Sequence, residues 1–111
     1  RVKMIIYNVT VNVDESIHSQ WMSWMTEKHI PEMLGTGKFS KALMTRVMVK
    51  EDLGGVTYSV QYTCSSRELL DEYYRKDAEV LQKEGFERFG NKFGSFRTEL
   101  QVIREFTTET S

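Results

Sequence analysis

His29 is the residue whose type and position offer the best candidate for chemistry in this chain. It stands near the end of a stretch with helical spacing, two residues before Pro31, where a cleft between a helix and a sheet could open. A neutral imidazole in such a cleft could act as a general base or orient a ligand. The alternative is a histidine at a helix C-terminus, which the helix macrodipole favours. We therefore name His29 as the one candidate catalytic residue.

Trp21, Trp24, Asn8 and Arg46 are the candidate ligand-binding residues. The two tryptophans lie on the apolar stripe of one predicted helix, where their indole N–H groups need partners. Asn8 or a tyrosine of the sheet could supply those partners, which would place Asn8 at the same pocket. Arg46 lies within a predicted strand, where a half-buried guanidinium must be paired or must bind an anion. The alternative for the tryptophans is simple core packing.

Arg97 lies in another predicted strand and raises the same question as Arg46. Glu99 follows it by two residues and so lies on the same strand face, which makes it a ready partner. We expect an Arg97–Glu99 ion pair rather than a carboxylate-binding site. Cys64 is expected to face the core, where a buried thiol behaves as a small apolar group.

The sequence predicts no metal or cofactor site. His18 and His29 would lie roughly 16 Å apart along a helix, too far to share one ion. The single cysteine is distant from both, which makes a structural zinc site improbable. The chain has no glycine-rich phosphate loop, no G-x-S-x-G and no H-E-x-x-H.

Composition narrows the class of protein. The chain has 111 residues, of which 40% are hydrophobic, enough for the core of one domain. Fifteen basic residues against 16 acidic ones give a net charge of -1, which argues against a nucleic-acid partner. No apolar run approaches the roughly 20 residues of a membrane span, and no signal peptide opens the chain. With one cysteine and no internal disulfide, we expect a cytoplasmic protein.

Hydrophobic periodicity predicts four strands and two helices that must position these residues. Strict alternation marks the strands over 4–13 and 56–64 most clearly. Asp14 is the expected N-cap of the first helix, Pro31 should break or bend it, and Ser65 with Glu68 has the spacing of a capping box. In chain order the elements are a strand over 4–13, a helix over 15–29, a strand over 39–50, a turn over 51–55, a strand over 56–64, a helix over 65–84 and a strand over 96–106.

The order β-α-β-β-α-β predicts an α+β, ferredoxin-like fold, with two helices on one face of a four-stranded antiparallel sheet. We expect a single domain over 4–106, with flexible termini at 1–3 and 107–111. The other face of the sheet would be polar but nearly uncharged, which suits burial against a second copy of the chain. The alternative is a monomer whose strand face meets water. The residues expected on that face are Asn8, Thr10, Asn12, Thr57, Ser59, Gln61, Thr63, Arg97, Glu99 and Gln101.

The chain resembles a small bacterial family of unknown function. The resemblance rests on MIIYNVTVNVDESIHSQWMSWM, EKHIPEMLGTGKF, GGVTYSVQYTC and FRTEL. It implies a subunit of the dimeric α+β barrel type and brings no activity. More loosely, the chain is similar to antibiotic-biosynthesis monooxygenases and muconolactone isomerases of that type, several of which have a tryptophan-rich first helix and a His-x-Pro near its end. The matching residues are Trp21, Trp24, His29, Pro31 and Gly37.

These observations leave three hypotheses for function. The first is a homodimeric module that binds a small ligand or serves a structural role. The second is a cofactor-independent oxygenase- or isomerase-like enzyme with His29 as the base. The third is a regulatory domain that senses a metabolite at the dimer interface. A cavity with His29 pointing into it would favour the second hypothesis over a purely structural role.

Overall fold

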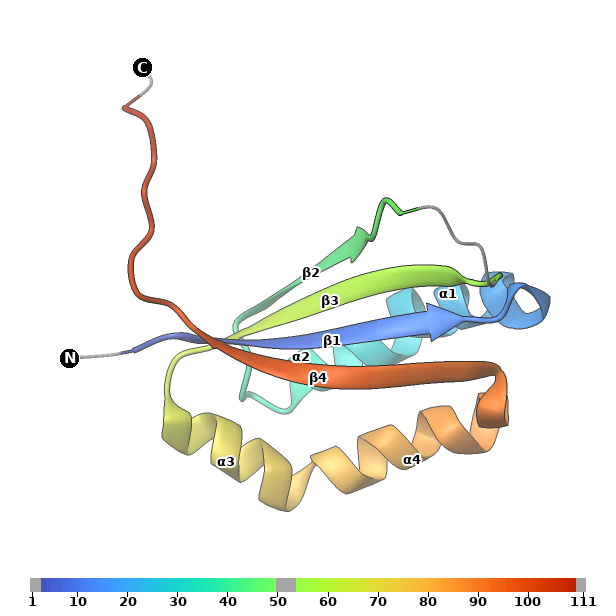
Figure 1. Ribbon diagram of the computed structural model, residues 1–111. Helices are drawn as coiled ribbons and strands as arrows, with labels where there is room; N and C mark the ends of the chain where they lie inside the picture. Colours follow the sequence, from blue (N-terminus) through green and yellow to red (C-terminus); the bar gives the residue numbers. More distant parts are fainter. Residues whose placement is uncertain (1–2, 50–53, 110–111) are drawn as a thin grey trace.

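The computed structural model describes residues 3–49 and 54–109, and its strands and helices follow the predicted order (Figure 1). Each of the three strand pairs, β1–β3, β1–β4 and β2–β3, is antiparallel. The sheet order is β2-β3-β1-β4, which confirms the predicted ferredoxin-like fold. The elements are β1 (Ile5–Val13), the 3-10 turn η1 (Glu15–Ile17), α1 (His18–Trp24), the π-helical turn η2 (Met25–His29), α2 (Ile30–Gly35), β2 (Lys41–Arg46), β3 (Val56–Cys64), α3 (Arg67–Lys76), α4 (Ala78–Phe89), the 3-10 turn η3 (Gly90–Lys92) and β4 (Phe93–Gln101).

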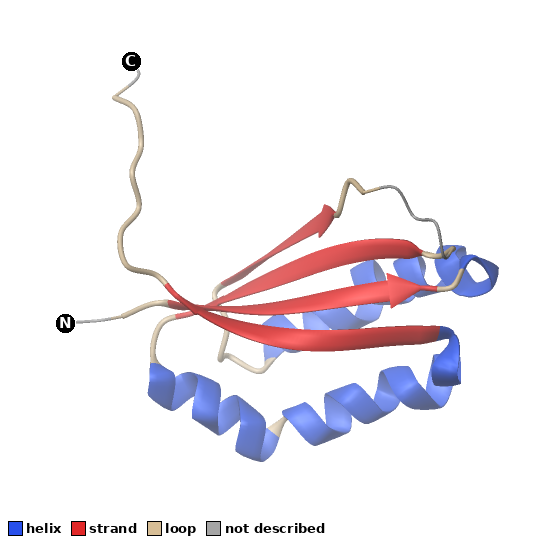
Figure 2. Cartoon of the chain, viewed as in Figure 1, coloured by secondary structure: helices blue, strands red, loops and turns tan. Residues whose placement is uncertain are grey.

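The helices lie on one side of the sheet and the core fills the space between the two layers (Figure 2). Strict alternation in β1 and β3 places every second side chain on this inner face. Cys64 is buried there as a free thiol, as predicted. The largest fully buried side chains are Trp21, Tyr7, Tyr62, Tyr73, Met33, Leu70, Val13 and Val60.

The first helical segment does not break at Pro31. Ile30 keeps helical dihedrals of φ -63° and ψ -44°, and its N–H donates to the carbonyl of Met25, five residues back. This π turn absorbs the misfit of Pro31, whose ring has no N–H to donate and would crowd the carbonyl of Glu27 in a regular helix. The helix therefore continues to Gly35, and His29 lies inside the π turn rather than at a helix end. Asp14 caps the segment as predicted.

The N-cap of the second helical segment lies one residue later than predicted. The Ser66 side chain accepts a hydrogen bond from the Leu69 N–H at 3.2 Å, so Ser66 is the N-cap. The expected capping box of Ser65 and Glu68 is therefore wrong, because Ser66 takes the capping role and its third helical residue is Leu69.

The same segment consists of two helices instead of one. The backbone at Asp77 leaves helical geometry, with φ -122° and ψ -33°, and α4 then runs to Phe89, past the predicted end. Lys38 donates to the Asp77 carboxylate at 2.9 Å and so ties the bend to the segment before β2. The bend lets both helices follow the sheet, as Figure 1 shows for α3 and α4.

Two strands differ from their predicted bounds. β2 covers only Lys41–Arg46, although Phe39 before it is buried in the core. Residues 50–53 lie outside the described residues, which removes the end of the predicted strand and most of the predicted turn over 51–55. β4 starts earlier than predicted and ends at Gln101. Beyond it the chain leaves the sheet without regular structure, and no described helix is long and apolar enough to span a membrane.

The pairing of β4 reverses the predicted faces of that strand. Arg97 pairs with Val9 and Glu99 with Tyr7, so both lie on the inner face with the core residues of β1. Phe96 pairs with Thr10 and lies on the outer face. The expectation that Arg97, Glu99 and Gln101 lie on the uncovered face is therefore wrong. Alternation assigned Phe96 and Leu100 to the core, but the pairing register with β1 places these apolar residues on the outer face.

The outer face of the sheet is polar at its centre and apolar toward its edges. Asn8 accepts a hydrogen bond from Ser59 at 2.6 Å and donates to Thr10 at 3.1 Å, and Asn12 donates to Thr57 at 3.0 Å. Three large apolar side chains lie exposed around this network, namely Leu43 (59%), Phe96 (63%) and Leu100 (41%). We call this surface the outer sheet face.

Candidate functional site

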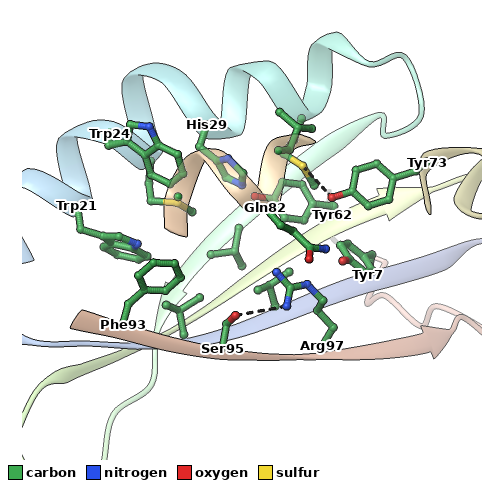
Figure 3. A pocket seen from close by; sticks show the side chains of 17 residues that line it. Tyr7, Trp21, Trp24, His29, Tyr62, Tyr73, Gln82, Phe93, Ser95 and Arg97 are labelled. Atoms are coloured by element: carbon green, nitrogen blue, oxygen red, sulfur yellow. Dashed lines mark hydrogen bonds between the residues drawn. The ribbon is translucent and has the colours of Figure 1, made fainter. Parts of the chain in front are cut away.

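A pocket of about 60 Å³ lies between the sheet and the helices (Figure 3). We call it the interlayer pocket. Each of the four strands except β2 contributes to its walls, together with α1, η2, α2, α3 and α4. Its volume would hold about four water molecules or a short apolar chain. Among the residues that line the pocket are Tyr7, Trp21, Trp24, His29, Gln82, Gly85, Phe93, Ser95 and Arg97.

His29 points into this pocket from the π turn. Its Nδ1 atom is buried and has no hydrogen-bond partner among the described residues. The ring stacks on Trp24 with centroids 4.6 Å apart and planes inclined by 21°. Burial lowers the pKa of His29 to about 4, with smaller contributions from the charges of Arg97 and Lys28, and Glu32 opposes the shift. His29 is therefore neutral at pH 7 and can offer a free ring nitrogen to a bound molecule.

Tyr7 brings a second unsatisfied polar group to the pocket. Its hydroxyl is buried and makes no hydrogen bond of normal geometry in the described part of the chain. Burial raises the pKa of Tyr7, while the nearby Arg97 guanidinium opposes the rise. Burial also raises the pKa of Tyr62 and of Tyr73, whose hydroxyl donates to the Met33 sulfur at 3.4 Å. All three phenols are neutral at pH 7, so Tyr7 is available as a hydrogen-bond donor.

Arg97 reaches into the pocket from β4, as Figure 3 shows. Its guanidinium donates to Ser95 at 3.3 Å, and no carboxylate among the described residues pairs with it. The predicted Arg97–Glu99 pair is wrong because Glu99 binds Arg67 at 2.7 Å and also accepts a hydrogen bond from Tyr74. Arg97 is thus an exposed cation of the pocket wall that forms no ion pair with any carboxylate of residues 3–49 or 54–109.

Gly85 of α4 makes room for the aromatic end of the pocket. A Cβ atom at this position would lie 3.2 Å from the Trp24 ring and 3.5 Å from the Phe93 ring. Trp24 also meets Phe89 edge-on, with centroids 5.6 Å apart. The close approach of the helix backbone therefore fixes the indole against which His29 stacks.

The structure brings together three of the five residues that sequence reasoning selected. Trp21, Trp24 and His29 line the interlayer pocket. Asn8 lies on the outer sheet face, because side chains alternate along β1, and so it cannot supply partners for the indole groups. Arg46 ends the edge strand β2 at an exposed position and does not line the pocket.

Sequence reasoning missed Tyr7 and Gln82 as members of the site and assigned Arg97 a structural role. Tyr7 could have been found, because it lies on the core-facing side of the clearest strand and its hydroxyl needs a partner. Arg97 could not, since its role depends on the pairing register of β4. Among the described residues no cluster of three His, Cys, Asp or Glu side chains could hold a metal ion.

Solved structures with the same fold cover nearly the whole chain. One is a dimeric ferredoxin-like protein from an uncultured marine organism, with a TM-score of 0.69 and 13% identity over 96% of this chain and 100% of that one. Another dimeric ferredoxin-like protein from an uncultured marine organism has a TM-score of 0.63 and 15% identity, over 95% and 99% of the two chains. A protein of the ethyl tert-butyl ether D (EthD) family from Bacillus halodurans has a TM-score of 0.63 and 12% identity, over 85% and 96%.

These identities are low, so the likeness shows a shared fold and carries no activity. No curated protein matches the sequence. A family model, by contrast, matches residues 4–103. This range contains all the strands and helices described above and the interlayer pocket between them. The chain therefore belongs to the family described as Domain of unknown function (DUF4286), as its sequence resemblance implied.

Proposed function

We propose that this protein is a homodimeric module that binds a small molecule in the interlayer pocket. One observation carries the proposal, namely that Tyr7 Oη and His29 Nδ1 are both buried, both unpartnered and both on the wall of one pocket. A buried polar atom without a hydrogen bond costs about 1–3 kcal/mol. A ligand that hydrogen-bonds to both atoms would recover that cost, so the pocket favours a polar occupant.

A thermal-shift screen of small metabolites tests ligand binding, because a molecule that binds only the native state raises the melting temperature. Val9→Phe would fill the pocket wall, whereas Val80→Phe changes an exposed position on α4. We expect a hit to lose its shift in Val9→Phe and to keep it in Val80→Phe. A screen without hits, or hits that both variants retain, would contradict the proposal.

The outer sheet face supports the dimer. The helices cover only the opposite face, and Leu43, Phe96 and Leu100 leave apolar surface around the polar network. The two neighbours described as dimeric ferredoxin-like proteins share the fold, which supports pairing of two copies of this chain. Packing of one outer sheet face on another would bury the apolar side chains and keep the central hydrogen bonds.

Phe96→Asp and Phe86→Asp form a matched pair to test this interface. The two side chains are almost equally exposed, at 63% and 64%, but Phe96 lies on the outer sheet face and Phe86 on α4. A buried carboxylate at the interface would be strongly unfavourable. Sedimentation velocity should show a dimer for the parent and for Phe86→Asp, and a shift toward monomer for Phe96→Asp. A monomeric parent would contradict the dimer.

An oxygenase- or isomerase-like enzyme with His29 as general base is the second candidate. The free Nδ1 atom favours it, because a base must have an unblocked nitrogen that faces the pocket. A pKa of about 4 makes His29 a weak base, so this candidate needs a substrate with an unusually acidic proton. Chemical change of a bound molecule over time, abolished in His29→Gln while binding persists, would establish the enzyme. A ligand recovered unchanged supports the binding module instead.

The regulatory-domain hypothesis and the cellular compartment are the two remaining expectations. The pocket lies on the helix side of the sheet, so it offers no support for metabolite sensing at the outer sheet face. The buried free thiol of Cys64 fits the cytoplasm, which we propose as the compartment.

A further inference from the structure

We propose that the interlayer pocket binds a short-chain monocarboxylate, with its carboxylate on Arg97 and its apolar chain against the aromatic end. This inference rests on the proposed ligand-binding function and adds the chemical class of the ligand. It follows from the charge of the pocket wall, from the guanidinium of Arg97, from the polarity of the two pocket ends and from the volume of the cavity.

The pocket wall carries a single formal charge, and that charge is positive. Arg97 is the cation, and no Asp or Glu is among the described residues that line the pocket. His29 and the tyrosines are neutral at pH 7 because burial opposes their charged forms. An anion would therefore meet attraction from Arg97 and repulsion from none of these lining groups.

Arg97 also has spare hydrogen-bonding capacity, as a comparison with Arg67 shows. Arg67 is held by two carboxylates, Asp71 at 2.8 Å and Glu99 at 2.7 Å. Arg97 gives one hydrogen bond to the hydroxyl of Ser95 and lies close to the Tyr7 hydroxyl, so several of its five N–H donors are left for another acceptor. A carboxylate fits such a planar fork with two parallel hydrogen bonds.

The two ends of the pocket differ in polarity, which matches a molecule with a charged head and an apolar chain. Figure 3 shows Arg97, Gln82 and Tyr7 at one end, and Trp21, Trp24 and Phe93 at the other. The Tyr7 hydroxyl and the Gln82 amide can donate to the same anion that Arg97 holds. The unpartnered donor of Tyr7 therefore gains its missing acceptor from this class of ligand.

The volume of the cavity limits the length of the apolar chain. A cavity of about 150 Å³ holds benzene, and the interlayer pocket has about 60 Å³. A phenyl ring would therefore not fit without rearrangement, whereas the propyl chain of butyrate has half the carbon atoms of benzene and suits this volume when the carboxylate lies outside it on the exposed Arg97. Butyrate is accordingly a suitable probe, and butyramide has the same shape without the charge.

An NMR titration of the isotope-labelled protein with butyrate and with butyramide tests the inference. Arg97 lies at an exposed position of β4, where solvent weakens a charge pair, so we expect butyrate to bind about threefold to fivefold more tightly than butyramide. Arg97→Gln should abolish that preference. Arg46→Gln removes the other strand arginine discussed above, which does not line the pocket, and should leave the preference intact.

Titrations with acetate, with 1-butanol and of the variant Arg97→Lys separate the contributions of the apolar chain, the charge and the planar guanidinium. Acetate should bind more weakly than butyrate, and equal binding would overturn the role of the apolar end. Arg97→Lys keeps the charge and loses the fork, so it should retain part of the preference even if Arg97→Gln fails to fold. Equal binding of butyrate and butyramide would overturn the anionic class but leave the ligand-binding function standing. Failure of butyrate, butyramide and 1-butanol alike, together with no hit in the metabolite screen, would overturn both.

Discussion

The two faces of the sheet treat their polar groups in opposite ways. On the outer sheet face Asn8 is hydrogen-bonded to Ser59 and Thr10, so its amide is satisfied within the chain. On the inner face the neighbouring residue Tyr7 has a buried hydroxyl without a partner. Two adjacent residues of β1 therefore differ, because the side chain of Asn8 is hydrogen-bonded within the chain and the hydroxyl of Tyr7 is not. The polar residue that sequence reasoning selected for binding completes a structural network, whereas the residue that it assigned to the core carries the unsatisfied hydroxyl.

Trp24→Ala should have the largest effect, because it removes the ring that fills the apolar end of the inner face. Trp24 is buried between His29, Phe89 and the backbone of Gly85. Loss of a buried tryptophan costs about 3–5 kcal/mol of unfolding free energy. Urea unfolding measures this cost, and Phe86→Ala at an exposed position of α4 is the control, with an expected change within about 0.5 kcal/mol. Similar losses for both variants would mean that the Trp24 site is not packed as described.

Acidification should be the next largest perturbation of the inner face. The pKa of His29 is about 4 in the native state and 6.5 in the unfolded chain, so the unfolded state binds the proton first as pH falls. The stability present above pH 6.5 is therefore lost between pH 6.5 and 4, amounting to about 2 kcal/mol at pH 5. The groups that set this shift besides burial are Glu32, Arg97 and Lys28.

Urea unfolding at pH 7.5 and pH 5 measures this loss. His29→Gln should lose less stability between the two pH values than the parent, because it removes the group that gains the proton. His18→Gln is the matched control, since His18 lies outside the pocket and bonds the Tyr58 hydroxyl. If His29→Gln and the parent lost the same amount, His29 would not be buried in its neutral form.

Asn8→Ala should disturb the outer sheet face by a smaller amount. The change leaves the Ser59 hydroxyl without its acceptor and removes a donor from Thr10, which predicts a loss of about 1–1.5 kcal/mol. Asn12→Ala on the same strand and face is the control, because its hydrogen bond to Thr57 is exposed and its loss should cost less. Unfolding of the two variants at equal protein concentration gives the comparison. A harmless Asn8→Ala would show that the outer network is not satisfied internally.

The sequence allowed the fold to be predicted where one side of an element is clearly apolar. The alternation of β1 and β3 placed Tyr7, Val11 and Val60 in the core correctly. In β4 the same rule, that the apolar side of a strand faces the core, gave the wrong face. The pairing with β1 places Arg97 and Glu99 on the inner face of this edge strand, beside the pocket. Its apolar residues Phe96 and Leu100 lie on the outer sheet face instead, where the proposed dimer would bury them.

Only those residues of the candidate site that lie on the first predicted helix could be predicted from the sequence. Trp21 and Trp24 lie on the predicted apolar stripe and His29 follows on the same predicted helix, so nearness in sequence was enough to group them. Arg97 joins them through strand register and through the loss of Glu99 to Arg67, a partner from a distant helix. Neither fact is local in sequence, so no spacing rule could supply it.

Tyr7→Phe should have the smallest effect on the free energy of unfolding. It tests whether a buried hydroxyl without a hydrogen bond contributes less to stability than a hydroxyl with one. The variant keeps the ring against Phe39 and Tyr73 and removes a hydroxyl that has no hydrogen bond, so stability should stay equal or rise by up to about 1 kcal/mol. Tyr58→Phe is the matched control, since that hydroxyl bonds His18 at 2.7 Å. We expect it to lose about 1 kcal/mol.

The ligand then reverses the order of these two variants. Butyrate binding should weaken in Tyr7→Phe, because this variant lacks the hydroxyl that would donate a hydrogen bond to the carboxylate. Binding should be unchanged in Tyr58→Phe. A Tyr7→Phe protein that is as destabilised as Tyr58→Phe would show that the Tyr7 hydroxyl already has a partner inside the chain. The pocket would then lose one of the two unsatisfied atoms on which its assignment as a binding site depends.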